Sequence, residues 1–126
     1  PRGAIHNDFH EFNLILENNK IKGLIDFNSF YGPLIYDISS AIVRFCFNKN
    51  GKLNRKHVRT LIEEYEKYRK ITKKEKVKLK EAIHYMLLWY NEYFTEKGKN
   101  MRALYMKHFK HGLKMLENLE KEEFII

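Results

Sequence analysis

The stretch HNDFHEFN at residues 6–13, followed by LILENNKIKGLIDF at residues 14–27, decides the fold and the chemistry that this sequence predicts. Residues 14–16 and 21–25 are two β-prone runs, and the turn-forming residues 17–20 between them predict a β-hairpin. Because the two ends of a hairpin lie side by side, Asn13 at its start and Asp26 at its end are expected to be close together.

Phosphoryl transfer explains these residue types at this spacing. It needs a carboxylate near the acceptor hydroxyl and oxygen ligands for the magnesium that neutralises the nucleotide phosphates. Asp8 can supply the first, and Asn13 with Asp26 the second. The same order occurs in the protein-kinase signature, His-x-Asp-x-x-x-x-Asn and then Asp-Phe after a hairpin. The alternative is that all three are ordinary turn and cap residues.

Beyond Pro33 the apolar spacing becomes helical, so the predicted fold class is mainly α with a small β-hairpin. The first helix begins near Ile35, Asn54 caps the second, and the capping box at residues 72–75 starts a third that continues to Lys97. Residues predicted to face inward on the third helix are Leu79, Ala82, Ile83, Met86, Tyr90, Tyr93 and Phe94. Those on a fourth helix are Met101, Leu104, Tyr105, Phe109, Leu113 and Leu116.

The chain is basic, with 24 Lys and Arg against 16 Asp and Glu and a formal charge of +8. Much of the excess positive charge lies between Lys67 and Lys80. We interpret this region as a solvated helix face and the turn before it. The alternative is a helical nucleic-acid-binding module, whose affinity would fall steeply with salt. No apolar run is long enough to span a bilayer, and the lone Cys46 fits a reducing compartment, so we expect a cytoplasmic protein without a membrane partner.

These motifs resemble those of the aminoglycoside phosphotransferase and choline kinase superfamily. Its loop usually has the pattern His-Gly-Asp-x-x-x-x-Asn followed by Ile-Asp-Phe, and GPLIYDI at residues 32–38 is similar to its Gly-Pro-x-x-x-Asp-Leu. Within the superfamily, PRGAIH at residues 1–6 is most like the bacterial homoserine kinase branch. The sequence departs from the pattern at Asn7, at residues 11–12 and at Asn28.

The resemblance implies a fold and a domain organisation. The fold would be the C-terminal, helical lobe of a protein-kinase-like fold, with the N-terminal nucleotide lobe absent. Residues 1–33 would be the catalytic loop and metal-binding hairpin, and residues 34–126 the helical subdomain. Without a nucleotide lobe the isolated chain is expected to be inactive. Self-association is expected through the surface left by that lobe, where Ile5, Phe27 and Phe30 would be exposed.

The resemblance also implies roles for single residues. Asp8 would orient and help to deprotonate the acceptor hydroxyl, while Asn13 and Asp26 would bind Mg2+ with ATP as the phosphate donor. His6 and Asp37 would support the loop rather than react.

The acceptor would be the hydroxyl of a small amino alcohol or amino acid, with homoserine first and choline or an aminoglycoside behind it. Acceptor-binding candidates are Asn28 and Tyr31 after the hairpin, together with Trp89 and Tyr90, whose rings can face a cationic amine.

Overall fold

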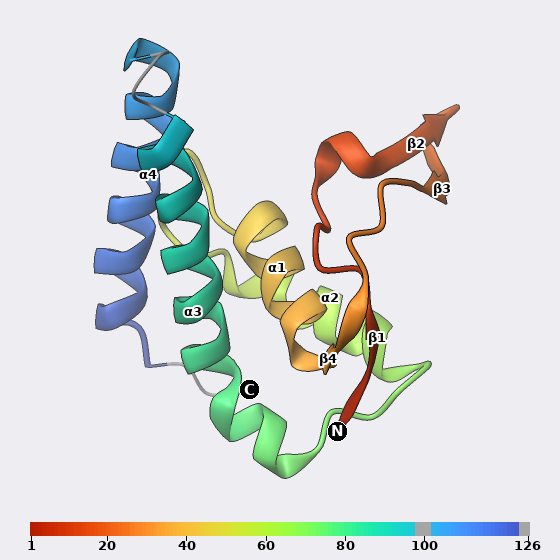
Figure 1. Cartoon of the computed structure of the whole chain (residues 1–126). Helices are drawn as coiled ribbons and strands as arrows, with labels where there is room; N and C mark the ends of the chain where they lie inside the picture. The colour runs from red at the N-terminus through yellow and green to blue at the C-terminus, as the bar shows by residue number, and fades with distance from the viewer. Residues whose placement is uncertain (98–101, 124–126) are drawn as a thin grey trace.

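A computed structural model describes residues 1–97 and 102–123. Within these residues, four strands come first and four helices follow (Figure 1). The strands are β1 (Arg2–Ile5), β2 (Leu14–Glu17), β3 (Lys20–Leu24) and β4 (Phe30–Pro33), with a short 3-10 helix, η1 (Glu11–Asn13), between β1 and β2. The helices are α1 (Ile35–Phe45), α2 (Arg55–Glu66), α3 (Lys73–Lys97) and α4 (Arg102–Lys121).

The strands form two separate antiparallel pairs. β2 and β3 are the predicted hairpin, and their turn residues Asn18 and Asn19 both have positive φ, which fits the tight turns that asparagine favours. β1 pairs with β4, from Arg2 opposite Pro33 to Ile5 opposite Phe30. This second pair was not predicted from the sequence, because four-residue strands distant in the sequence carry no local turn signal. The mainly helical fold class is confirmed, and one strand pair is added to it.

The helices begin where local signals predicted. The Asn54 side chain accepts hydrogen bonds from the N–H groups of Lys56 and His57 at the start of α2. At the start of α3, Glu75 N donates to Thr72 Oγ1 (3.2 Å) and Thr72 N donates to Glu75 Oε2 (2.9 Å), which is a complete capping box. The predicted break at residues 98–100 lies outside the described residues.

The core lies where α1 packs on α3 and α3 packs on α4. Its fully buried side chains include Ile38, Ile42, Leu79, Ile83, Leu87 and Leu119. The prediction of which side chains face inward was right for Leu79, Ala82 and Ile83, which are buried. It was wrong for Tyr93 and Leu113, which are exposed. Among the described residues of α4, the buried apolar side chains are instead Met115 and Leu119. Phe94, Met101 and Leu104 lie outside the residues whose side chains are described.

The hairpin projects away from the helices (Figure 1). Its apolar side chains are largely exposed, including Ile15, Leu16 and Ile21, and so are Phe27 and Phe30 after it. The expectation that Ile5 is exposed was wrong, because the β1–β4 pair leaves only 2% of Ile5 accessible. Within the described residues, none of the helices combines the length and apolarity that crossing a membrane requires.

Candidate active site

The loop at residues 6–13 is held at its start by one carboxylate. Asp37, in the first turn of α1, accepts hydrogen bonds from His6 N at Oδ2 (2.7 Å) and from Asn7 N at Oδ1 (3.0 Å). A carboxylate that takes one N–H on each oxygen fixes both the position and the direction of the backbone. Asp37 therefore holds the backbone that follows β1 against the first turn of α1.

The same face of α1 holds the rest of the loop. Ser40 lies three residues after Asp37 and Arg44 seven residues after it, which places all three on one side of the helix. Ser40 Oγ donates to Phe9 O (3.2 Å), and the Arg44 guanidinium lies 3.2 Å from Glu11 Oε2. Ser40 and Arg44 were not predicted as loop supports, although their spacing from Asp37 was a usable signal.

Asn7 has a left-handed backbone, with φ of 62°. Asparagine tolerates this conformation better than most side chains and glycine tolerates it best. Asn7, which stands where the superfamily pattern commonly has a small residue, is thus compatible with the turn that this position requires.

His6 ties the loop to the end of the hairpin. Its buried ring accepts from Asp8 N at Nδ1 (3.3 Å) and lies 3.1 Å from Ile25 O through Nε2. This pattern fits the neutral tautomer with its hydrogen on Nε2. Since both ring nitrogens are engaged with backbone, His6 acts as a clamp between residues 8 and 25.

Asp8 and Asn13 face each other across the loop. Asn13, buried at the end of η1, donates from Nδ2 to Asp8 O (2.9 Å) and lies 3.4 Å from Asp8 Oδ2. His10 Nε2 lies 3.4 Å from the other carboxylate oxygen, Oδ1. The Asp8 carboxylate is partly exposed, so it remains open to a ligand rather than pointing into packed interior.

The hairpin brings the backbone beside Asp26 back to Asn13. Ile25 N donates to Asn13 O (3.1 Å), which joins the residue before Asp26 to Asn13. Asp26 is exposed and has a φ of 58°, an uncommon conformation for an aspartate. Such backbone outliers concentrate at functional sites, because the surrounding structure must stabilise them.

The four acceptor candidates do not form one group. Asn28 and Tyr31 are exposed, and Arg2 is engaged with Tyr31, since its guanidinium donates to Tyr31 O and lies 5.8 Å from the ring centroid. Trp89 lines a small cavity that also includes Asn7. Tyr90 faces away from this cavity, because adjacent residues on a helix point about 100° apart. The Arg44 guanidinium lies over the Tyr90 ring, 5.3 Å from its centroid. Burial raises the pKa of the Tyr90 phenol, and Arg44 only partly offsets this.

Metal binding by protein side chains alone is not evident in the described residues. Among residues 1–97 and 102–123, no group of three or more His, Cys, Asp or Glu is placed to hold an ion. An amide oxygen and one or two carboxylates nevertheless suit Mg2+, which usually keeps several waters and takes its remaining ligands from substrate phosphates. Asn13 and Asp26 are residue types that such a partial site uses, and Ile25, the residue before Asp26, is hydrogen-bonded to Asn13 O.

Comparison with known proteins decides the family. The model of the phosphotransferase enzyme family (APH) matches residues 1–71, which include the 6–13 loop, the hairpin, α1 and α2. The chain belongs to the phosphotransferase enzyme family.

Several relatives in this phosphotransferase family are homoserine kinases. That of Methylobacillus flagellatus is 34% identical over 76 residues, covering 60% of this chain and 24% of the relative. That of Sinorhizobium fredii is 38% identical over 79 residues, covering 60% and 23%. That of Phenylobacterium zucineum is 31% identical over 85 residues, covering 67% and 26%. The chain thus spans about a quarter of the length of the curated relatives it matches.

Proposed function

We propose that this chain carries the phosphate-transfer loop of an ATP- and Mg2+-dependent kinase whose acceptor is the hydroxyl of a small amino acid or amino alcohol. The observation that supports this most is the loop geometry at the base of the hairpin: Asn13 donates to Asp8 O, and both His6 and Asn13 contact the backbone of Ile25, the residue before Asp26. Homoserine is the first acceptor to test, because the relatives above are named for it.

In the proposed reaction Asp8 accepts the proton of the acceptor hydroxyl as that oxygen bonds to the γ-phosphorus of ATP. The bond from that phosphorus to the bridging oxygen breaks, and ADP leaves with the bond's electron pair. Asn13 and Asp26 would hold Mg2+, which neutralises charge on the phosphates when bound. His6 and Asp37 would keep the loop in position without exchanging protons with substrate.

The basic region at residues 67–80 gives little support to a nucleic-acid-binding function. Many of its cations are already paired within the protein: Lys67 with Glu64, Arg69 with Glu75, Lys76 with Glu66 and Lys78 with Glu81. A phosphate backbone would have to compete with these carboxylates, so the kinase function is preferred.

The experiment is an ADP-release assay on the natural gene product that carries this sequence, with homoserine and a panel of amino alcohols. We expect Asp8→Asn to lower kcat by about 100-fold or more, since a positioned general base contributes roughly that much. Asn13→Ala and Asp26→Asn should raise the Mg2+ concentration needed for half-maximal rate. Glu17→Gln, on the exposed hairpin, is the matched control and should leave the rate unchanged. An Asp8→Asn protein as active as the unaltered one would refute the proposal.

A further inference from the structure

The short helix η1 carries Asn13, the proposed metal ligand, but has little apolar packing of its own. Its middle residue, Phe12, is 78% exposed, and Glu11 before it is exposed as well. The Leu14 N–H donates to Glu11 O, so Glu11 and Asn13 belong to a single turn. A 3-10 helix of one turn has no packed face, and its position depends on the polar contacts at its ends. A contact that holds Glu11 therefore also holds Asn13.

Arg44 supplies that contact from the last turn of α1. Its Nε donates to Glu11 Oε2 (3.2 Å), and its Nη2 lies 3.2 Å from the same oxygen. The Arg44 side chain is 20% exposed and that of Glu11 is 50% exposed. Exposed ion pairs usually contribute little to stability, because two long side chains must be ordered to form them. Arg44 differs from such a pair, because a second contact orders its guanidinium.

Tyr90 makes this second contact from α3. The Arg44 guanidinium lies 5.3 Å from the centroid of the Tyr90 ring, and stacking on an aromatic face fixes the plane of a guanidinium. Burial is the main cause that raises the pKa of the Tyr90 phenol, while the charge of Arg44 lowers this pKa and that of Glu11 raises it. Both charges therefore act at the Tyr90 ring, and the three side chains form one group.

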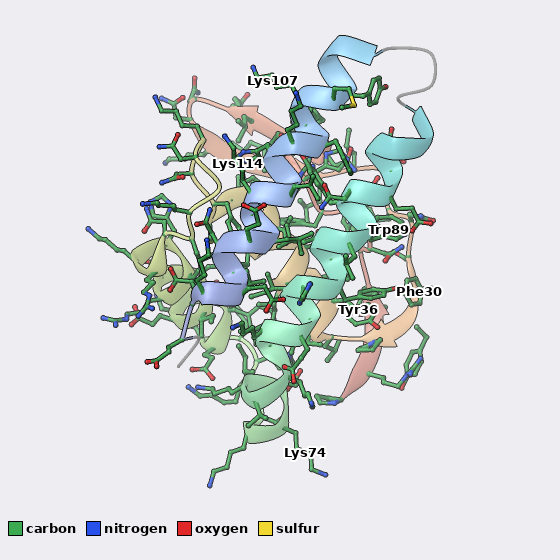
Figure 2. All side chains as sticks on the ribbon, turned by 90° about the vertical axis from the view of Figure 1, so that its left-hand side faces the viewer. Phe30, Tyr36, Lys74, Trp89, Lys107 and Lys114 are labelled. Atoms are coloured by element: carbon green, nitrogen blue, oxygen red, sulfur yellow. The ribbon has the colours of Figure 1, made fainter. Side chains whose placement is uncertain are left out.

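Tyr90 is in turn anchored on the packed pair of helices α3 and α4. Its hydroxyl lies 3.4 Å from His108 Nδ1 of α4. The neighbouring Trp89 lines the small cavity beside Asn7, and Figure 2 shows Trp89 on the side of α3 that is farther from α4. Tyr90 therefore connects Arg44 to the helical core, and the contacts run without a break from α4 to η1.

We propose that Arg44 is a positioning residue for the metal side of the site. Held between the Tyr90 ring and the Glu11 carboxylate, it fixes η1, and through η1 the side chain of Asn13, relative to the helices. This inference rests on the proposed function and deepens it. It gives Tyr90 a role other than acceptor binding, and it gives a use to Glu11, where the sequence departs from the superfamily pattern.

Kinetics of the natural gene product that carries this sequence test the inference. Arg44→Gln and Glu11→Gln should each lower kcat, and raise the Mg2+ concentration for half-maximal rate, by about ten-fold. A displacement of about 1 Å can cost roughly 100-fold, so these losses correspond to a smaller shift. The KM for the acceptor should stay unchanged, because Asn13 is assigned to the metal. Arg44→Lys keeps the charge without the planar stack and should lose less than Arg44→Gln.

The double variant Glu11→Gln/Arg44→Gln separates one shared contact from two independent effects. It should be no worse than either single variant, because each substitution already breaks the same contact. Glu64→Gln is the matched control, since it breaks the exposed ion pair with Lys67 on α2 and should leave kcat, KM and the Mg2+ requirement unchanged.

Tyr90 distinguishes positioning from acceptor binding. Tyr90→Leu removes the ring that orders Arg44 and should lower kcat about three-fold, whereas Tyr90→Phe keeps the ring and should lose less. If Tyr90 instead bound the acceptor, Tyr90→Leu would raise the KM for the acceptor and leave kcat unchanged. That result would overturn the inference.

Mn2+ binding tests the same contact without turnover. In this chain with ADP present, Arg44→Gln should raise the Mn2+ concentration that broadens the Asn13 amide signal by about ten-fold. The amide signal of His6, which Asp37 holds independently, should keep its chemical shift in the unliganded variant. Circular dichroism establishes that each variant keeps its helices.

An unchanged Mn2+ concentration for Arg44→Gln, or additive losses in the double variant, would overturn the inference. These outcomes are distinct from failure of the kinase proposal. If Asp8→Asn abolishes transfer while Arg44→Gln alters neither kcat nor the metal requirement, the kinase stands and the role of Arg44 falls. If no acceptor is phosphorylated but Mn2+ binding at Asn13 depends on Arg44, the kinase falls and the role of Arg44 stands.

Discussion

Asp37 carries the largest share of the loop's support at the level of single residues. It satisfies two backbone N–H groups, those of His6 and Asn7, that would otherwise be left partly buried without a partner. Asp37→Ala should lower the free energy of unfolding by about 2–4 kcal/mol, because each orphaned donor costs roughly 1–3 kcal/mol. Asp37→Asn keeps one acceptor oxygen and should lose less.

Chemical denaturation followed by circular dichroism measures this effect. Ser40→Ala is the matched control on the same face of α1, since it removes a single hydrogen bond to Phe9 O and should cost about 1 kcal/mol. Equal losses for Asp37→Ala and Ser40→Ala would contradict the role given to Asp37.

Residue types and spacing predicted the hairpin that separates Asn13 from Asp26, because a hairpin is a local structure. The left-handed backbone of Asn7 and Asp26 could not be predicted from the same pattern, since it depends on the bonds to Asp37 and to Asn13. Trp89 was singled out for a cationic amine, but its cavity partners Tyr36 and Tyr85 were not. They meet only through the packing of α1 on α3.

The start of α3 is the element whose stability should depend most on pH. Burial alone would raise the pKa of the Glu75 carboxyl, but hydrogen bonds from Arg69 and Thr72 outweigh burial and the net pKa is lowered. A carboxyl with a lower pKa in the folded state stabilises the fold fully above its unfolded pKa, near 4.5. That stabilisation is lost as the pH falls through the lower folded pKa.

Glu75→Gln should therefore cost about 1.5–3 kcal/mol near neutral pH, the usual worth of hydrogen bonds to a charged group. The difference from the unaltered chain should shrink as the pH is lowered below about 4.5, in denaturation curves recorded from pH 7 to pH 3. Glu81→Gln is the control, since Lys78 lowers the pKa of the exposed Glu81 carboxyl but solvent screens that pair. A loss of unfolding free energy in Glu75→Gln that stays the same from pH 7 to pH 3 would contradict this account.

Gly112 sets the approach of α4 to α3. A Cβ at this position would collide with Asn91 Oδ1, while Asn91 Nδ2 donates to Leu87 O (2.8 Å) within α3. Helix propensity alone predicts that Gly112→Ala stabilises the protein by about 1 kcal/mol. We expect the opposite, a loss of about 1–3 kcal/mol from overpacking. Thermal unfolding decides the sign, and adding Asn91→Ala should restore much of the loss.

The starts of α2 and α3 were predictable because capping by Asn54 and by Thr72 with Glu75 is local. The rotation of α4 was not, since Leu113 and Met115 are both apolar and periodicity does not choose between them. The close contact at Gly112 involves a residue of another helix, Asn91, and so it left no signal in the α4 sequence itself. The β1–β4 pair was missed for a similar reason.

At the scale of the whole molecule, the 6–13 loop lies between the projecting hairpin and the helices (Figure 1). The structure also offers a competing place for phosphates. A larger cavity, of about 540 Å³, lies between Pro1, Pro33 and the first two turns of α3. Lys73 and Lys74 line it, together with Glu75 and with Lys78, which is paired with Glu81. Lysines suit a phosphate, but this cavity includes neither Asp8 nor Asn13. The location of bound nucleotide therefore separates the kinase proposal from simple anion binding.

The most direct measurement is NMR of this chain titrated with ADP and substoichiometric Mn2+, whose unpaired electrons broaden nearby amide signals. The proposed metal pair predicts that Asn13 and Asp26 broaden first, together with Asp8, and that excess Mg2+ or Asp26→Asn suppresses the effect. Glu117 on α4 should be unaffected. Broadening that begins at Lys73 and Lys74, or that is unchanged by Asp26→Asn, would contradict the assignment of the base of the hairpin as the phosphate-transfer site.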